Sequence, residues 1–267
     1  MPPKKKQKEN VQVLLAHKFN ESKHNPVDYF MSEKLDGLRA FWNGSSLFTR
    51  NGSPICTPSW FTEGWPSLEI DGELFLGRKM FNETSSIVRK QCQSKENDLA
   101  WRSIKYMVFD LPASEETFEE RMIELKSVSS KLRNIVYVEQ SLCQSKEHLL
   151  LELEKVLALG GEGLMLRESK SMYIPKRSYT LLKVKVMMDA EATVIGYKMG
   201  KGKNSKVVGS LECELKDGSV FFVGTGLSDQ DRKIPPPIGS CISYSYQELT
   251  PSGVPRFPVF RGFCVDR

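Results

Sequence analysis

The pattern of apolar and polar positions predicts strands in the first part of the chain. Residues 70–76 and 104–111 each have the apolar content of a strand. Asn43-Gly44 and Asn51-Gly52 are sequences that favour tight hairpin turns. We therefore expect strands and turns from residue 31 to residue 111.

Two later segments have the spacing of helices. A helix is predicted to start at Thr117, because Glu120 stands three residues further on and completes a capping box. A second is predicted for residues 146–159, where Gly160-Gly161 would end it. The expected apolar stripes are Phe118, Met122, Leu125 and Leu132 in the first helix and Leu149, Leu153, Val156 and Leu157 in the second.

Only strand signals follow the second helix. In residues 180–186 the alternation places Lys183 and Lys185 on one face of a predicted strand and valines on the other. The character changes near residues 187–191, and about eighty residues of short strands, glycine turns and a break at 235–237 come after it. This pattern is typical of a small all-β barrel. We expect a basic tail at 1–10, one domain at 11–187 and a second at 188–267.

Composition and charge exclude several classes of protein. The 267 residues carry 38 basic and 33 acidic side chains, a formal net charge of +5, and 40% are hydrophobic. No apolar run approaches the roughly 18 residues needed to cross a bilayer, and no secretory signal is recognisable. A membrane protein, a secreted miniprotein and a fibre are excluded. An intracellular protein is expected, nuclear or cytoplasmic, because Lys4 to Lys8 resemble a nuclear-import signal but also a solubilising end.

The six cysteines lie far apart and none forms a C-x-x-C pair. We expect them to be reduced, in a reducing compartment, and expect no structural zinc. The histidines, His17, His24 and His148, have no metal-ligand spacing, and structural roles are expected for them.

Candidate chemistry begins with Lys34-Leu35-Asp36-Gly37-Leu38-Arg39. Taken alone, this segment is equally compatible with an Asp-Gly turn between surface charges. Further segments follow it in order: Thr49-Arg50-Asn51-Gly52, Asp71-Gly72-Glu73-Leu74, Tyr106-Met107-Val108-Phe109-Asp110, Gly161-Glu162-Gly163-Leu164-Met165-Leu166-Arg167, Leu182-Lys183-Val184-Lys185 and Pro255-Arg256-Phe257-Pro258-Val259-Phe260.

From about residue 11 to residue 260 this series resembles the ATP-dependent DNA ligases, which are covalent nucleotidyltransferases, and in particular the minimal bacterial-type enzymes. The resemblance implies an α+β nucleotidyltransferase domain of antiparallel sheets with flanking helices, followed by an oligonucleotide/oligosaccharide-binding (OB) barrel. It also implies a monomer that seals nicks in duplex DNA. Two alternatives are an RNA ligase or capping-type nucleotidyltransferase, and a non-catalytic nick-binding protein.

The resemblance assigns Lys34 as the nucleophile that takes AMP from ATP. A lysine amine can attack a phosphorus atom when it is deprotonated, so partial burial and neighbouring positive charge are expected around it. Lys183 and Lys185 would supply that charge and neutralise phosphate oxygens. The alternative is that these two lysines are exposed on an edge strand and oppose aggregation.

The resemblance also implies the remaining binding roles. Glu73 and Glu162 would bind ribose and Mg²⁺ (or Mn²⁺), for which carboxylates are suitable ligands. Phe109 would stack on adenine, although its apolar neighbours also suit a core residue, and Ser32 would lie beside the base edge. Arg39 would contact ribose and the nick phosphate, and Arg50 the 5′-phosphate of the nick.

In the barrel, four lysines stand without an acid between residues 197 and 209, namely Lys198, Lys201, Lys203 and Lys206. They suit either phosphate contact or a solvated loop. The long latch insertion of the small viral ligases is not expected there.

After Phe260 the family usually has one or two further arginines, where this chain has Gly262 and Cys264. Either self-adenylation is then expected to be slow, or Arg256 is expected to orient pyrophosphate alone. Arg261 is expected on the opposite face unless Gly262 bends the strand.

Overall fold

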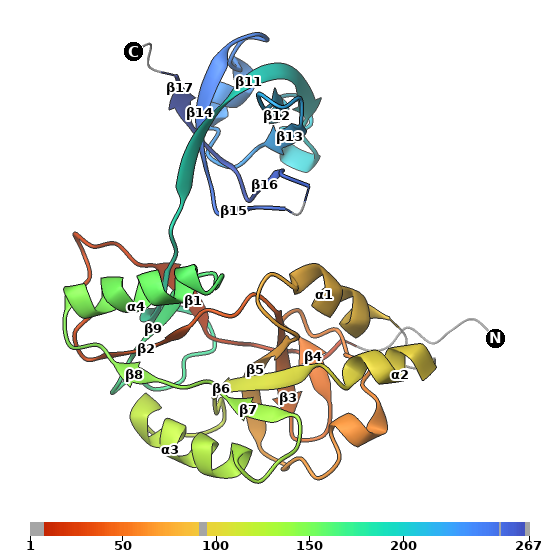
Figure 1. The fold of residues 1–267 in the computed structure, drawn as a ribbon, viewed down its shortest axis with the longest axis vertical. Coiled ribbons are helices and arrows are strands. Elements are labelled where there is room, and N and C mark those ends of the chain that lie inside the picture. Colours follow the sequence, from red (N-terminus) through yellow and green to blue (C-terminus); the bar gives the residue numbers. More distant parts are fainter. Residues whose placement is uncertain (1–7, 91–94, 251, 265–267) are drawn as a thin grey trace. The chain divides into compact units, whose positions relative to one another are not determined.

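The computed structural model describes residues 8–90, 95–250 and 252–264, without the side chains of Lys95 and Lys203. Two compact units divide the chain, Met1–Val184 and Lys185–Arg267 (Figure 1). Residues 1–7 of the predicted basic tail lie outside the described residues, whereas residues 8–10 are exposed. Within the described ranges, no helix has the length and apolar character to cross a membrane.

The first sheet of the N-terminal unit has the strand order β1-β10-β9-β2-β8. Its pairs are antiparallel except for β1 with β10. Helix α4 covers it, because Leu149 and Leu153 are buried together with Leu164, Leu166 and Leu182 of the sheet. The elements are β1 (Leu15–Lys18), β2 (Tyr29–Glu33), β8 (Ser141–Leu142), α4 (Lys146–Ala158), β9 (Leu164–Glu168) and β10 (Arg177–Val184).

The second sheet has the order β4-β3-β5-β6-β7, with β6 and β7 parallel. Its core contains the buried rings of Trp42, Phe61, Trp101 and Tyr106, against which Leu125 of α3 packs. The elements are β3 (Leu38–Asn43), β4 (Leu47–Thr49), the 3₁₀ helix η1 (Ser59–Phe61), β5 (Glu69–Phe75), α1 (Phe81–Arg89), α2 (Lys95–Trp101), β6 (Lys105–Asp110), α3 (Phe118–Ser129) and β7 (Ile135–Tyr137).

The C-terminal unit is a five-stranded antiparallel sheet of order β13-β12-β11-β14-β17, with a separate hairpin of β15 and β16. A bridge between Thr225, which follows β13, and Val259 on β17 connects the two edges of this sheet. The elements are β11 (Met188–Met199), η2 (Gly202–Asn204), β12 (Val208–Glu214), β13 (Val220–Val223), α5 (Asp229–Lys233), β14 (Cys241–Tyr246), β15 (Glu248–Leu249), β16 (Pro255–Arg256) and β17 (Val259–Phe263).

The two predicted helices and the fold class are confirmed, but α3 ends at Ser129, so Leu132 of the predicted stripe lies outside it. Thr117 is the N-cap of α3, and its backbone N–H donates to the Glu120 carboxylate at 2.9 Å, as the capping box requires. Helix α4 ends where Gly160 adopts a φ of +80°, which a residue without a β-carbon tolerates best. Strands β5 and β6 match the predicted strands to within a residue at either end.

Other helices were not predicted. The segment from 31 to 111 contains α1 and α2 as well as strands, and α5 interrupts the strands of the C-terminal unit. Helix α1 buries Thr84, Ser85 and Val88, so its inward face lacks the apolar stripe from which a helix is recognised. The strand predicted for residues 180–186 ends at Val184, so Lys185 lies beyond it and begins the C-terminal unit.

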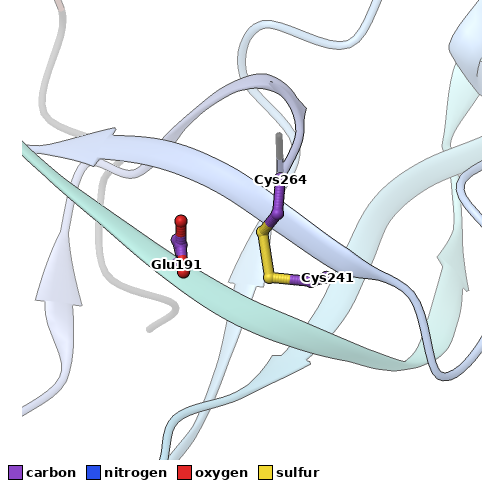
Figure 2. Close-up of side chains that lie close together, drawn as sticks. All are labelled: Glu191, Cys241 and Cys264. Atoms are coloured by element: carbon purple, nitrogen blue, oxygen red, sulfur yellow. A yellow bond between two sulfur atoms is a disulfide. The ribbon is translucent and has the colours of Figure 1, made fainter. Parts of the chain in front are cut away.

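The prediction that all cysteines are reduced is wrong for one pair. Cys241 and Cys264 form a disulfide (Figure 2), although 23 residues separate them. The cause is strand register. Ile242 pairs with Phe263, so Cys241 at the start of β14 faces Cys264, the residue directly after β17. Glu191 lies beside this disulfide, but both sulfur atoms are already bonded to each other. Cys56, Cys143 and Cys213 are not part of a disulfide, and Cys92 lies outside the described residues.

Candidate functional site

Lys34 stands directly after β2 and points toward the segment that precedes β9. Its backbone N–H donates to Gly163 O at 2.8 Å, and its ammonium forms an ion pair with the Glu162 carboxylate. The Glu162 side chain is only 5% exposed, against 23% for Lys34. Two residues nearly 130 positions apart in sequence are therefore joined at one partly buried site.

Glu73 lies on β5 beside the turn that follows Lys34. Its carboxylate accepts the backbone N–H of Gly37 at 2.9 Å. A β-carbon at Gly37 would lie 2.4 Å from the carbonyl oxygen of Leu74, so this close approach requires glycine. Burial raises the pKa of Glu73 to about 7, although the positive charge of Lys34 and the Gly37 hydrogen bond act in the opposite direction.

Lys183 reaches the same site from β10. Lys183 pairs with Met165 on β9, which in turn pairs with Ser32 on β2, so the three positions form a row across the first sheet. Burial lowers the pKa of Lys183, and the nearby positive charges of Lys34 and Arg177 lower it further. The N-terminal unit thus brings Lys34, Glu73, Glu162 and Lys183 within electrostatic reach of one another.

Arg39 on β3 is held by groups that the sequence did not single out. Its guanidinium donates to both Asp71 carboxylate oxygens, at 3.0 and 2.5 Å, and Asp71 also accepts the Tyr173 hydroxyl at 2.7 Å. Burial alone would lower the pKa of Arg39, but the pairing with Asp71 offsets it and the pKa is raised. The Tyr173 hydroxyl accepts the Leu14 backbone N–H at 3.1 Å. A sequence signal for Asp71 exists, because it lies two residues before Glu73 on the same strand.

Phe109 is next to this arginine. The Arg39 guanidinium lies 5.5 Å from the centre of the Phe109 ring. Phe109 is only partly buried, whereas its neighbours Val108 and Asp110 on β6 are buried. Its ring therefore belongs to the side of β6 that faces away from the unit's core.

Beyond Arg39, the predicted DNA-contacting residues whose side chains are described are exposed. Arg50 follows β4 in the turn that contains Gly52. Lys198 lies on β11 with its ammonium 5.1 Å from the centre of the Phe222 ring, and Lys201 and Lys206 flank the short helix η2. The side chain of Lys203 lies outside the described residues. The connection from β11 to β12 is closed by Gly200 N–H donating to Val207 O at 3.0 Å, so no long insertion is present in it.

In the C-terminal unit, two predicted cations contact adjacent residues of one hairpin. The Lys185 ammonium donates to the Gln247 side-chain oxygen at 2.8 Å. The Arg256 guanidinium forms an ion pair with Glu248, and its centre lies 5.1 Å from the Phe257 ring centre. Neither Gln247 nor Glu248 was predicted, and the sequence carries no signal for them.

Arg261 is redirected by a bulge. Ser243 pairs with Gly262 but Tyr244 pairs with Phe260, so Arg261 is an extra residue in β17. The Arg261 guanidinium donates to the Ser245 hydroxyl, which donates to Asp189 at 2.6 Å. The irregularity in β17 is therefore at Arg261 itself, next to Gly262, where the sequence left a bend open.

Comparison with known proteins agrees with this geometry. Residues 14–185 match the family model described as the ATP dependent DNA ligase domain, and residues 199–263 match the DNA ligase OB-like domain. The DNA ligase of Haemophilus influenzae is 39% identical over 254 residues, which cover 94% of this chain and 91% of that protein. The chain belongs to the ATP-dependent DNA ligases.

Solved structures of DNA ligases share the fold. A Lig E DNA ligase is 38% identical, with a TM-score of 0.89, over 95% of this chain and 99% of the other. A Chlorella virus DNA ligase–adenylate is 26% identical, with a TM-score of 0.54, over 96% of this chain and 99% of that one. As a member of this family, the ligase uses ATP and a divalent metal ion. The carboxylates of Glu73 and Glu162, both close to Lys34, are a donor set that fits such an ion.

Proposed function

We propose that this ligase seals nicks in duplex DNA through an AMP adduct on Lys34. The observation that carries the proposal is the site around Lys34, where a lysine, two buried carboxylates and a second lysine with a lowered pKa interact in one unit. A nucleotidyl transfer depends mainly on positioning and charge neutralisation, which such a group of residues supplies.

In the first step, the Lys34 ammonium gives up a proton to water and its nitrogen attacks the α-phosphorus of ATP. A bond from nitrogen to phosphorus forms, the bond to the bridging oxygen breaks, and pyrophosphate leaves. Lys183 and Lys185 neutralise phosphate oxygens, while Arg256 orients the leaving pyrophosphate. A Mg²⁺ or Mn²⁺ ion held by Glu73 and Glu162 would add further neutralisation of charge. Ser32, Arg39 and Phe109 bind the nucleoside.

In the second step the 5′-phosphate of the nick takes AMP from Lys34, and in the third the 3′-hydroxyl displaces AMP and closes the strand. Arg50, together with Arg39, holds the 5′-phosphate, a task for which guanidinium geometry is suited. Lys198, Lys201, Lys203 and Lys206 contact phosphates of the duplex. We further propose that the boundary between the two domains in the sequence lies at residues 187–188, close to the division at Lys185. We also propose that the ligase acts as a monomer.

The test is incubation with α-labelled ATP and Mg²⁺ followed by denaturing electrophoresis. The intact ligase is expected to carry labelled AMP, and Lys34→Ala is expected to carry none. Lys155→Ala, which removes an exposed lysine of α4, is the matched control. An unlabelled intact protein would overturn the covalent mechanism, and preferential sealing of nicked RNA would overturn the DNA substrate.

We propose that the protein is nuclear or cytoplasmic. This location was expected partly because the cysteines were expected to be reduced. The Cys241–Cys264 disulfide is of a kind that is rare in reducing compartments. Localisation of the tagged full chain in its native host is the measurement that decides.

A further inference from the structure

The hairpin of β15 and β16 begins the segment of residues 255–260, and its residues contact two basic side chains, Lys185 and Arg256. Glu248 on β15 pairs directly with Arg256 on β16, so the two side chains that form the ion pair are cross-strand neighbours. Immediately before Glu248, Gln247 accepts from Lys185, whose position lies more than sixty residues earlier in the chain. Two adjacent residues thus contact cations from two separate segments.

The hairpin itself is fixed by its own hydrogen bonds. Thr250 N–H donates to Val254 O and Gly253 N–H donates to Thr250 O, both at 2.8 Å. The Val254 N–H also donates to the Thr250 hydroxyl at 3.0 Å. A two-residue strand pair gains its rigidity from such a closed turn, so Gln247 and Glu248 project from a defined backbone.

The backbone that follows Arg256 is also constrained. Phe257 has a φ of +53°, a conformation that is uncommon for a residue with a bulky side chain. Such a residue persists only where its surroundings hold it, and it often accompanies a functional position. The Arg256 guanidinium is flanked by the Phe257 ring and the Glu248 carboxylate, with 20% of its side chain exposed.

We propose that Gln247 and Glu248 are positioning residues that hold Lys185 and Arg256 in the orientation in which they bind phosphate. A flexible cation loses rotamer freedom when it binds a phosphate, and a side chain that is already oriented loses less. Glu248 fixes Arg256 by a charge-assisted hydrogen bond, and Gln247 fixes Lys185 through a neutral acceptor. This inference rests on the phosphate-contacting roles proposed above for Lys185 and Arg256.

The experiment measures Lys34 adenylation with α-labelled ATP and, separately, the sealing of a pre-adenylated nick. Glu248→Ala is expected to slow adenylation about tenfold through kcat, with little change in KM and unchanged sealing. Glu248→Gln, which keeps an acceptor for Arg256, is expected to lose less. Glu214→Ala removes the same charge from an exposed position of β12 and is expected to adenylate at the normal rate.

A double-mutant cycle distinguishes positioning from a general effect. Because Glu248 acts through Arg256, the double variant Glu248→Ala/Arg256→Ala is expected to be no slower than Arg256→Ala alone. The same non-additivity is expected for Gln247→Ala with Lys185→Ala. Additive losses, faster adenylation by Glu248→Ala, or equal loss in both assays together with a lower melting temperature would each overturn the inference.

Failure of the proposed function gives a different result. If Arg256→Ala adenylates at the normal rate, the role of Arg256 itself is wrong, and the positioning inference falls with it. If Arg256→Ala is slow while Glu248→Ala and Gln247→Ala are normal, the role of Arg256 stands and only the positioning inference is overturned.

Discussion

Arg39 in the N-terminal unit pairs with Asp71 and Arg256 in the C-terminal unit pairs with Glu248, but the two pairs differ in burial. Asp71, the partner of Arg39, is fully buried and also accepts the Tyr173 hydroxyl. Glu248, the partner of Arg256, is 29% exposed and belongs to a short hairpin. Water competes with the second pair much more than with the first.

This difference teaches that similar contacts serve different purposes in the two units. A buried carboxylate with several donors keeps its arginine in a single geometry, and its loss leaves an uncompensated charge inside the protein. A partly exposed pair contributes little to stability but orients a side chain that must also reach a ligand. In the N-terminal unit, the contact that orients Arg39 therefore also stabilises the fold. In the C-terminal unit, the contact that orients Arg256 contributes little to the stability of the fold.

The largest expected effect breaks the buried pair. Asp71→Ala leaves Arg39 without its carboxylate and is expected to lower the free energy of unfolding of the N-terminal unit by about 3–5 kcal/mol. Glu248→Ala is the matched variant, with an expected loss of about 1 kcal/mol or less. All four tryptophans lie in the N-terminal unit, so tryptophan fluorescence during urea unfolding measures the stability of Asp71→Ala, whereas hydrogen exchange on peptides from β15 and β16 measures that of Glu248→Ala.

Asp71→Asn refines this result, because it preserves the shape of the side chain and removes only its charge. Its stability is expected to lie between those of the wild type and Asp71→Ala. Equal losses in the free energy of unfolding, each measured on the variant's own unit, would contradict the distinction between the two pairs.

The next effect concerns what stabilises the C-terminal unit. Reduction of Cys241–Cys264, or Cys241→Ser, is expected to destabilise this unit by roughly 3 kcal/mol, because the cross-link restricts the unfolded chain. Hydrogen exchange measured on peptides from β14 and β17 is expected to accelerate. A thiol reductant is expected to reproduce this in the wild type and to leave Cys241→Ser unchanged. Cys56→Ser, which removes a cysteine of the other unit that is not in a disulfide, is the control.

The parts of the fold that depend on local sequence were predictable. Helix α3 was recognised because its capping box and its buried Phe118, Met122 and Leu125 lie within a few turns. Helix α1 was missed because its buried face includes Thr84 and Ser85, which do not form an apolar stripe. Local pattern therefore finds an element only when the buried face is apolar.

Contacts between distant segments were not predictable from pattern. The Cys241–Cys264 disulfide follows from the register of β14 with β17, and Asp71 reaches Arg39 because β3 pairs with β5. A one-residue change in either register would separate these side chains. Lys34 and Glu162 were singled out through a family resemblance, whereas Gln247 belongs to no such pattern.

The smallest effect tests whether Tyr173 contributes to the buried network. Tyr173→Phe keeps the ring but removes the hydroxyl that donates to Asp71 and accepts from Leu14 N–H. The expected loss is about 1–2 kcal/mol in the free energy of unfolding, because one buried backbone donor is left without its acceptor. Tryptophan fluorescence again reports it, and Tyr179→Phe, at a residue that is 61% exposed, is the control. If Tyr173→Phe were as stable as its control, Arg39 would be held by Asp71 alone, and the buried network would be no more than a pair.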